Sequence, residues 1–290
     1  MRPLPWIIRG LTLTVLLLAP SGGGAVVALI LVALGIPHGA ADHLIYRSQH
    51  AGTGTSWSLR FSAYYLLLIA AYALLWLLVP LLALILFLAV SVYHFGQSRA
   101  GDPVEQLLWG LFVLGFPVLG HFAQAQPVIA GMIGFSPDLP GWVTAYLPSL
   151  FVLSVGAVAI RCDDYERLLD LALLAAVFLS VDLLLGFAIY FLLWHSLPAA
   201  RDQWLYLRQH SLSGRLSTYL LQLLPLTLGA FVTLALVYWF VLRQADGTAL
   251  PLSHLFILVS LITLPHALLV SVVYRTPPGE EATTPPAHRP

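Results

Sequence analysis

Long apolar stretches separated by short polar or proline-containing breaks dominate the hydropathy pattern of this chain. They lie at about 6–19, 24–45, 60–79, 81–97, 104–121, 141–160, 168–197, 216–242 and 252–274. A membrane-spanning helix needs about 20 apolar residues, with a range of about 17–25. Prolines mark several boundaries, where a missing backbone N–H is best tolerated, as at Pro20, Pro80, Pro103, Pro140 and Pro251. The pattern predicts an all-α, polytopic transmembrane bundle of eight to nine membrane segments.

Two stretches leave the number of crossings open. The stretch 168–197 is too long for one untilted span and too short for two ordinary ones. It crosses once, or it forms a broken or re-entrant pair around Ser180-Val181-Asp182, and the second option is favoured because it brings His195 to the same depth as the other histidines. The stretch 6–19 has the basic start of a signal peptide, but no small-residue cleavage site follows cleanly, so we expect an uncleaved helix. Residues 1–275 are then one transmembrane domain, and the Pro-rich tail 276–290 is expected to be disordered.

The arginines predict the orientation of this bundle. Loops at 21–24, 80 and 121–140 contain no arginine, and the predicted crossings place them on one side. The opposite side would carry Arg2, Arg9, Arg47, Arg60, Arg99, Arg161 and Arg167. Because arginine-rich loops stay on the cytoplasmic side, we expect a cytoplasmic N-terminus in a multi-pass protein of the cell (inner or plasma) membrane.

Composition narrows the class of protein further. Of 290 residues, 59% are hydrophobic and only 9% charged, whereas soluble domains carry roughly 25% charged residues. The single cysteine, Cys162, excludes an intramolecular disulfide and any Cys-rich metal site. All 13 basic residues are arginine, so a retinal-binding opsin, which needs a lysine for its Schiff base, is excluded. Phosphate loops, nucleophile elbows and basic nucleic-acid patches are absent, so phosphoryl transfer, serine-triad chemistry, NAD-dependent chemistry and nucleic-acid binding have little support.

Histidines in the apolar stretches are the strongest chemical signal. An imidazole inside a bilayer helix is costly, faces protein rather than lipid and marks a functional site by default. Imidazole is also the commonest protein ligand for iron, copper and zinc. Because the candidates lie on different predicted helices, several could converge on one metal ion. They are His38, His43, His94, His195 and His266.

The densest motif is Gly35-Ile36-Pro37-His38-Gly39-Ala40-Ala41-Asp42-His43. Its small residues let a neighbouring helix or a bulky ligand approach the backbone. Pro37 can kink the helix and aim His38 inward, and Asp42, four residues later, could orient an imidazole. His43 lies about 140° round an α-helix from His38, so both could bind one ion only if the helix were distorted. Alternatively, Asp42 and His43 form an interfacial polar pair near Arg47.

Three further motifs carry one histidine each, Tyr93-His94-Phe95-Gly96, Trp194-His195-Ser196 and Leu264-Pro265-His266. His195 is the strongest case for burial, since the aromatic and aliphatic residues before it offer no polar partner. His94 could instead be an interfacial side chain that reaches water, and His266 could simply accompany a proline kink.

Neutral imidazoles with few carboxylates suit a redox-capable Fe(II) that leaves a position open for O₂. Zinc held by three histidines and a water is the competing metal. A site within the apolar slab is accessible to lipid-soluble substrates, and O₂ partitions into the same phase. The setting therefore favours oxidation of a hydrophobic substrate over hydrolysis.

Together the strings Pro37-His38-Gly39-Ala40-Ala41-Asp42-His43, His94-Phe95-Gly96, His195-Ser196 and Leu264-Pro265-His266 resemble the Brp/Blh family of bacterial and archaeal integral-membrane β-carotene 15,15′-dioxygenases. The resemblance runs from residue 35 to about 274. Members of the family cleave the central double bond of β-carotene with O₂ to give two molecules of all-trans-retinal, commonly for a rhodopsin of the same cell. The resemblance implies a membrane-embedded non-haem Fe(II) dioxygenase in which His38, His94 and His195 are catalytic iron ligands.

One position departs from the family pattern, in which a further histidine follows the His-Ser pair by one turn. Here that position is Ala199. The fourth ligand is then His266 or His43, or the site has three histidines. A non-catalytic carotenoid- or retinal-binding protein, or a rhodopsin-assembly protein, is the alternative on the same scaffold. A membrane desaturase or hydroxylase is disfavoured because no HxxxH or HxxHH cluster occurs.

β-Carotene is almost purely hydrocarbon, so we expect it to enter laterally from the bilayer rather than from water. Aromatic and small residues beside the histidines are the candidates for lining its path. They are Gly35, Gly39, Tyr93, Phe95, Phe191 and Trp194.

Overall fold

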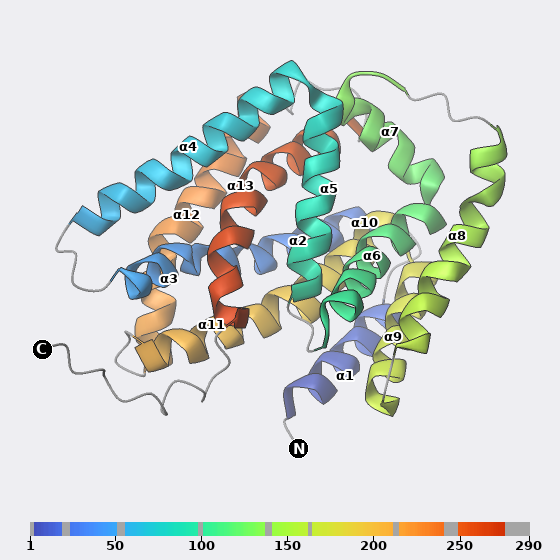
Figure 1. Ribbon diagram of the computed structural model, residues 1–290, viewed down its shortest axis with the longest axis horizontal. Helices are drawn as coiled ribbons and strands as arrows, with labels where there is room; N and C mark the ends of the chain where they lie inside the picture. The colour runs from blue at the N-terminus through green and yellow to red at the C-terminus, as the bar shows by residue number, and fades with distance from the viewer. Residues whose placement is uncertain are drawn as a thin grey trace, which may run out of the picture.

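The computed structural model describes residues 3–18, 24–50, 56–97, 101–136, 141–161, 164–210, 215–240 and 249–275. Within these ranges every regular element is a helix (Figure 1). The elements are α1 (Pro3–Leu18), α2 (Gly24–Gly35), the 3₁₀ segment η1 (Ile36–Ala41), α3 (Asp42–Gln49), α4 (Trp57–Leu78), α5 (Pro80–Gln97), α6 (Pro103–Gly120), α7 (Phe122–Ile133), α8 (Gly141–Ile160), α9 (Tyr165–Ser180), α10 (Leu183–Ile189), the π-helical segment η3 (Tyr190–Ser196), α11 (Leu197–His210), α12 (Leu216–Phe240) and α13 (Ala249–Arg275). The predicted tail 276–290 lies outside the described residues.

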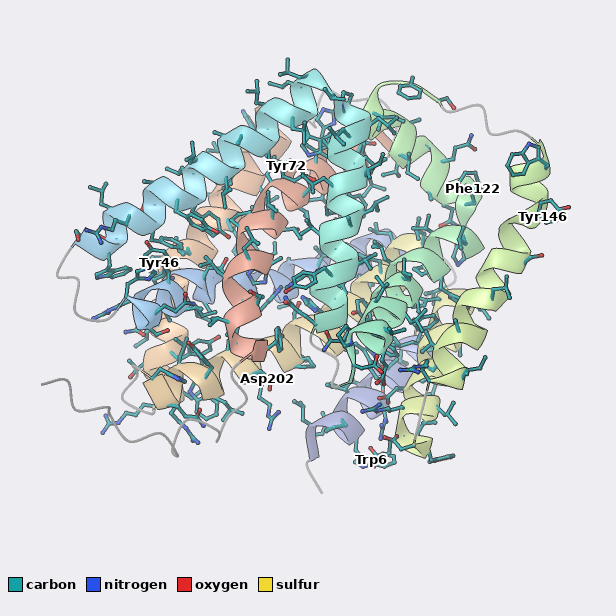
Figure 2. All side chains as sticks on the ribbon, viewed as in Figure 1. Trp6, Tyr46, Tyr72, Phe122, Tyr146 and Asp202 are labelled. Carbon is teal, nitrogen blue, oxygen red and sulfur yellow. The ribbon has the colours of Figure 1, made fainter. Side chains whose placement is uncertain are left out.

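Seven helical segments of the described chain are long and apolar enough to cross a membrane, and α1 is a shorter apolar helix. The outside of the bundle carries many apolar side chains, including Trp6 and Tyr146, which are 49% and 62% exposed (Figure 2). Leu77 is 82% exposed. Exposed apolar surface on this scale suits lipid rather than water. The predicted all-α multi-pass membrane bundle is confirmed, whereas its inside–outside orientation stays a prediction.

Two interrupted helical segments run through the middle of the bundle (Figure 1). One is α2–η1–α3 and the other is α10–η3–α11. They pack on each other, α10 and η3 against α2, and α11 against η1 and α3, while α5 and α13 run beside each other across them. Each of the two central segments leaves α-helical geometry at its middle, so the irregular turns lie where neighbouring helices surround them.

The break predicted within 168–197 is present. Helix α9 ends at Ser180, Val181 adopts an extended conformation, and the Asp182 side chain accepts a hydrogen bond of 3.0 Å from the Leu185 backbone N–H. An aspartate at this position caps the N-terminus of a helix, because it satisfies a backbone donor that has no intrahelical partner. The apolar stretch is therefore divided between α9 and a separate 28-residue span, Leu183–His210.

The expectation that 121–140 is an outer loop is wrong for most of its length. Helix α7 occupies Phe122–Ile133 and packs against α13. The Ser253 hydroxyl donates to the Val128 carbonyl over 2.8 Å, and a Cβ at Gly131 would collide with the Ser253 side chain. The glutamines and Pro127 within this helix interrupt its apolar pattern. The helix is buried on one side by packing that hydropathy does not reveal.

Candidate metal centre

Four imidazoles from four different elements converge inside the bundle. His38 lies on η1, His94 on α5, His195 on η3 and His266 on α13, and all are 1–7% exposed. The distances between ring centroids are 5.1 Å for His38–His195 and 4.7 Å for His195–His94. They are 4.9 Å for His94–His266 and 5.1 Å for His266–His38. Neighbouring ring planes are inclined at 77° to 89°. The four rings therefore form a closed cycle, which we call the square, in which neighbouring rings meet edge to face.

The spacing of the ring nitrogens fits a single ion. His94 Nε2 and His195 Nε2 are 3.1 Å apart. Two nitrogens bound about 2.1 Å from one ion are roughly 3.0–3.4 Å apart for octahedral or tetrahedral angles. One ligand nitrogen from each of His38, His94 and His195 lies within 4.8 Å of the other two. His266 is not part of this group of three. Its Nε2 is nevertheless buried and has no hydrogen-bond partner among the described residues, which suits a fourth ligand.

Pro37 explains the local structure around His38. It lacks the N–H that an α-helix would need at that position, and the chain adopts a 3₁₀ turn from Ile36 to Ala41. His38 Nδ1–H donates to the Gly35 carbonyl over 2.5 Å. That bond leaves Nε2 as the nitrogen available to a metal.

His195 is presented by a π-helical segment. The Leu197 backbone N–H bonds to the Leu192 carbonyl, five residues back. A π turn inserts one residue, which rotates the following side chains by about 100° relative to a continuous α-helix. The turn therefore decides which residue of Trp194-His195-Ser196 faces the other three imidazoles, and this is His195.

Gln97 holds the His94 ring. The Gln97 amide lies 2.9 Å from His94 Nδ1, and Gln97 Oε1 is buried without a partner in the described chain. Turning the amide by 180° lets Oε1 accept from Nδ1–H, which is the arrangement that a metal-binding Nε2 requires. Gln97 follows His94 by three residues on α5, so this contact could have been found from helical spacing.

Asp42 orients His266 and not His38, which is nearer to it in sequence. His266 Nδ1 donates to Asp42 Oδ1 over 2.7 Å, and the Tyr65 hydroxyl donates to Asp42 Oδ2 over 2.7 Å. Asp42 is 1% exposed, so these two bonds satisfy a carboxylate that would otherwise be costly to bury. A carboxylate on the outer nitrogen directs Nε2 to the metal and raises its basicity. Sequence analysis missed Tyr65, which is brought in by α4 and carries no local motif.

His43 is not brought into the square. Its Nδ1–H donates to the Ala40 carbonyl over 2.8 Å, and its ring lies 6.4 Å from Phe61. Ala199 is buried, and no side chain there can bind a metal. Of the two predicted replacements for the missing family histidine, it is His266 whose ring completes the square.

The structure places only some of the candidate path residues beside open space or the imidazoles. A Cβ at Gly35 would lie 2.5 Å from the Phe191 ring, so Gly35 serves close packing, and Tyr93 points outward at 46% exposure. A Cβ at Gly39 would meet only His266 Nδ1, at 3.9 Å, so space remains beside the imidazoles. Phe95 lies 4.9 Å from the His195 ring, whereas Trp194 bonds to α1.

A row of aromatic rings extends from the metal site. Phe191 stacks on His195 with a centroid distance of 6.0 Å, Phe187 stacks on Phe191 at 5.7 Å, and Phe256 meets Phe187 at 5.9 Å. All three phenylalanines are partly exposed. We call this set the phenylalanine row; of its members, sequence analysis had proposed only Phe191.

The fold and site define a class of protein, a multi-pass helical membrane protein with a buried histidine centre suited to one metal ion. The family model for β-carotene 15,15′-dioxygenase matches residues 29–274, and this chain belongs to that family. It is 25% identical over 297 residues to the probable β-carotene 15,15′-dioxygenase Blh of Halobacterium salinarum, covering 88% of this chain and 85% of the relative. It is 24% identical over 265 residues to β-carotene 15,15′-dioxygenase of an uncultured marine bacterium, covering 85% of this chain and 92% of that relative. No solved structure matches it significantly.

Proposed function

We propose that this protein is a membrane-embedded non-haem iron dioxygenase that cleaves the central 15,15′ double bond of β-carotene with O₂. One carbon–carbon double bond breaks, and each of its carbons takes one oxygen atom, giving two molecules of all-trans-retinal. The observation that carries the proposal is the square of four buried imidazoles in a member of the β-carotene 15,15′-dioxygenase family.

We assign His38, His94, His195 and His266 as the ligands of Fe(II), and we leave His43 out. Four neutral nitrogens suit a redox-capable iron, which supplies the activation of O₂ when bound. The protein's own contribution is to fix the rings. The Gly35 carbonyl, Gln97 and Asp42 hold the outer nitrogens of His38, His94 and His266. Phe95 and Phe191 pack on the site and exclude water from it.

The phenylalanine row is the part of the chain best suited to hold the polyene. Phe191, Phe187 and Phe256 form a continuous, partly exposed apolar surface long enough to contact an extended hydrocarbon, and the row starts at a ring of the metal site. A substrate without polar groups gains its binding energy from such apolar contact and needs no hydrogen bond. We propose that β-carotene enters from the lipid phase of the cell membrane, and that a rhodopsin of the same cell receives the retinal.

Co-expression in carotenoid-producing cells, followed by pigment extraction, tests this function. Loss of orange colour with all-trans-retinal as the product is the expected result, and the His38→Ala variant should leave the pigment intact. A C₄₀ product carrying hydroxyl groups would indicate a hydroxylase. Unchanged β-carotene bound to an iron-free protein would indicate a carotenoid-binding protein instead.

A further inference from the structure

His195 differs from the other three imidazoles in how its ring is held. His38, His94 and His266 each have a hydrogen-bond partner for the outer ring nitrogen. His195 Nδ1 is buried and has no hydrogen-bond partner among the described residues. A metal-bound histidine almost always donates its second N–H to a partner that fixes the ring. The orientation of His195 must therefore come from packing and from the backbone turn that carries it.

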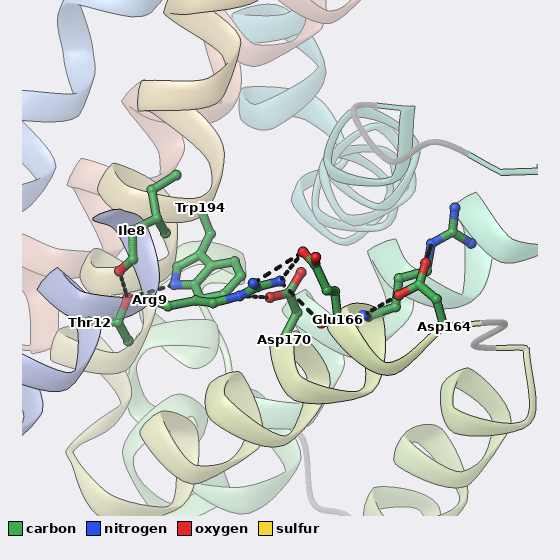
Figure 3. A network of polar contacts seen from close by, with 8 residues as sticks. Ile8, Arg9, Thr12, Asp164, Glu166, Asp170 and Trp194 are labelled. Atoms are coloured by element: carbon green, nitrogen blue, oxygen red, sulfur yellow. Dashed lines mark hydrogen bonds and ion pairs between the residues drawn. The ribbon is translucent and has the colours of Figure 1, made fainter. Parts of the chain in front are cut away.

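The residue before it, Trp194, is tied to a distant helix. Trp194 Nε1–H donates to Thr12 Oγ1 over 2.9 Å, and Thr12 Oγ1 in turn donates to the Ile8 carbonyl over 2.8 Å (Figure 3). Thr12 lies on α1 and is fully buried. Because its proton is used within α1, the hydroxyl presents a lone pair to the indole. The bond thus joins the π-helical segment η3 to α1.

Helix α1 is itself anchored by Arg9, less than one turn before Thr12. Arg9 Nε donates to Asp170 Oδ1 over 2.8 Å, and its terminal nitrogens donate to Glu166 Oε2 over 3.2 Å (Figure 3). The Arg9 side chain is only 6% exposed, and the guanidinium also lies 4.5 Å from the centre of the Trp6 ring. A planar guanidinium that meets two carboxylates gives α1 a defined position on α9.

We propose that Thr12 is a positioning residue for the metal centre, which acts by holding Trp194 and thereby the rotation of η3 that aims His195. The inference rests on the proposed function for the identity of the ion. A ring nitrogen lies roughly 5–6 Å from its helix axis, so a rotation of about 10° moves it by about 1 Å. Functional constellations tolerate only about 0.5 Å. Helix α1 precedes residue 29, where the family match begins, so this support comes from outside the matched region.

The test is the Thr12→Val variant, which keeps the shape of the side chain and removes the acceptor. Purified protein in detergent would be loaded with Fe(II) without oxygen, and the affinity measured by competition with a chelator. Co(II) would be used in parallel, because its absorption spectrum reports the ligand geometry. We expect Thr12→Val to bind Fe(II) about 10-fold or more weakly, which is the range for loss of an orienting contact, and to change the Co(II) spectrum. Thr12→Ser keeps the acceptor, so its Fe(II) affinity and its Co(II) spectrum should be those of the wild type.

Thr14→Val is the matched control. Thr14 lies on the same helix and makes the same type of bond, from its hydroxyl to the Gly10 carbonyl over 2.9 Å, but it is exposed. It should leave both metal readouts unchanged. If Thr12 merely stabilises the packing of α1, Thr12→Val lowers the melting temperature while affinity and spectrum stay as in the wild type, and the proposal is overturned.

A double-mutant cycle with Trp194→Phe separates this route from general loosening. Phenylalanine keeps an aromatic ring but lacks the donor, so each single variant and the double variant should show the same loss of affinity. Additive losses would contradict the proposal. A wild-type protein that binds no metal would refute the proposed function together with this inference, whereas normal metal binding by Thr12→Val refutes the inference alone.

Discussion

His266 and Asp42 come from opposite ends of the chain, and their contact is the least expected residue-level feature of the site. Sequence spacing put Asp42 one turn after His38, on the same face of an α-helix, and left open which imidazole the carboxylate would orient. The 3₁₀ turn at η1 changes the direction of the side chains, and Asp42 instead bonds to His266 over 2.7 Å. His38 uses the Gly35 carbonyl. His38 and His266 therefore have different hydrogen-bond partners.

If His266 is a ligand, His266→Ala should remove iron and activity together, as we also expect of His38→Ala. Iron per chain, measured by elemental analysis of purified protein, is the readout. His43→Ala is the control, because the His43 ring donates to the Ala40 carbonyl and packs on Phe61. It should retain iron. A His266→Ala protein with full iron content and low turnover would show that this ring contacts substrate rather than metal.

Removing the charge of Asp42 should weaken metal binding without removing any ligand. We expect Asp42→Asn to lower Fe(II) affinity about 10–100-fold, the usual effect of losing a carboxylate behind a ligating histidine. Tyr65→Phe removes only one bond to the same carboxylate and should have a smaller effect. Chelator competition measures both. Equal losses in the two variants would mean that Asp42 acts through packing and not through its charge.

At the scale of elements, two departures from α-helical geometry build the site. Segment η1 presents His38, and segment η3 presents His195. They meet because Gly35 leaves room for the Phe191 ring and the Ser196 hydroxyl, which a Cβ would approach to 2.5 and 2.9 Å. The close approach of α2 and η3 therefore depends on a hydrogen atom in place of a methyl group.

Gly35→Ala should push η3 away from α2 and disturb the metal centre. Overpacking of this kind costs about 1–3 kcal/mol, and we expect a lower melting temperature with a reduced iron content. Gly115→Ala on α6 is the control, since a Cβ there has nothing within 4 Å. Replacing that helical glycine should stabilise the protein by up to about 1 kcal/mol. Normal iron binding by Gly35→Ala would show that η3 can shift without losing its ligand position.

The phenylalanine row predicts a defect confined to substrate binding. Phe187→Ala removes a ring that touches the row on both sides but no histidine. We expect KM for β-carotene in detergent micelles to rise severalfold while iron content stays at the wild-type level. Phe135→Ala, at a residue that is 51% exposed, is the matched control and should leave KM unchanged. An unchanged KM in Phe187→Ala would place the polyene elsewhere.

At the scale of the whole molecule, the four imidazoles join two central segments to α5 and α13. A ligand that binds only the folded state stabilises it by about 2.7 kcal/mol at 100 times its Kd. Fe(II) should therefore raise the melting temperature of the detergent-solubilised bundle, and a chelator should lower it again. In His38→Ala the metal-dependent increase should be absent. An increase of wild-type size in that variant would indicate metal binding outside the square.

Some of this structure was open to sequence analysis because it depends on local pattern. Runs of about 20 apolar residues require helices, since a bilayer leaves backbone polar groups no other partner. The break at Ser180-Val181-Asp182 was visible because polar residues interrupt such a run. His38, His94 and His195 stood out for a similar reason, as imidazoles are rare in apolar stretches.

The tertiary structure decided what depends on contacts between distant segments. The glutamines and Pro127 of α7 interrupt its apolar run, so the search for long apolar stretches missed this helix, and its packing on α13 shows that it belongs to the bundle. Sequence analysis offered both His266 and His43 as replacements for the missing family histidine. Only the meeting of α13 with η1 separates them, placing His266 in the square and leaving His43 on Phe61. Tyr65 and Thr12 likewise gain their partners from helices far away in sequence, since hydrogen bonds form between neighbours in space.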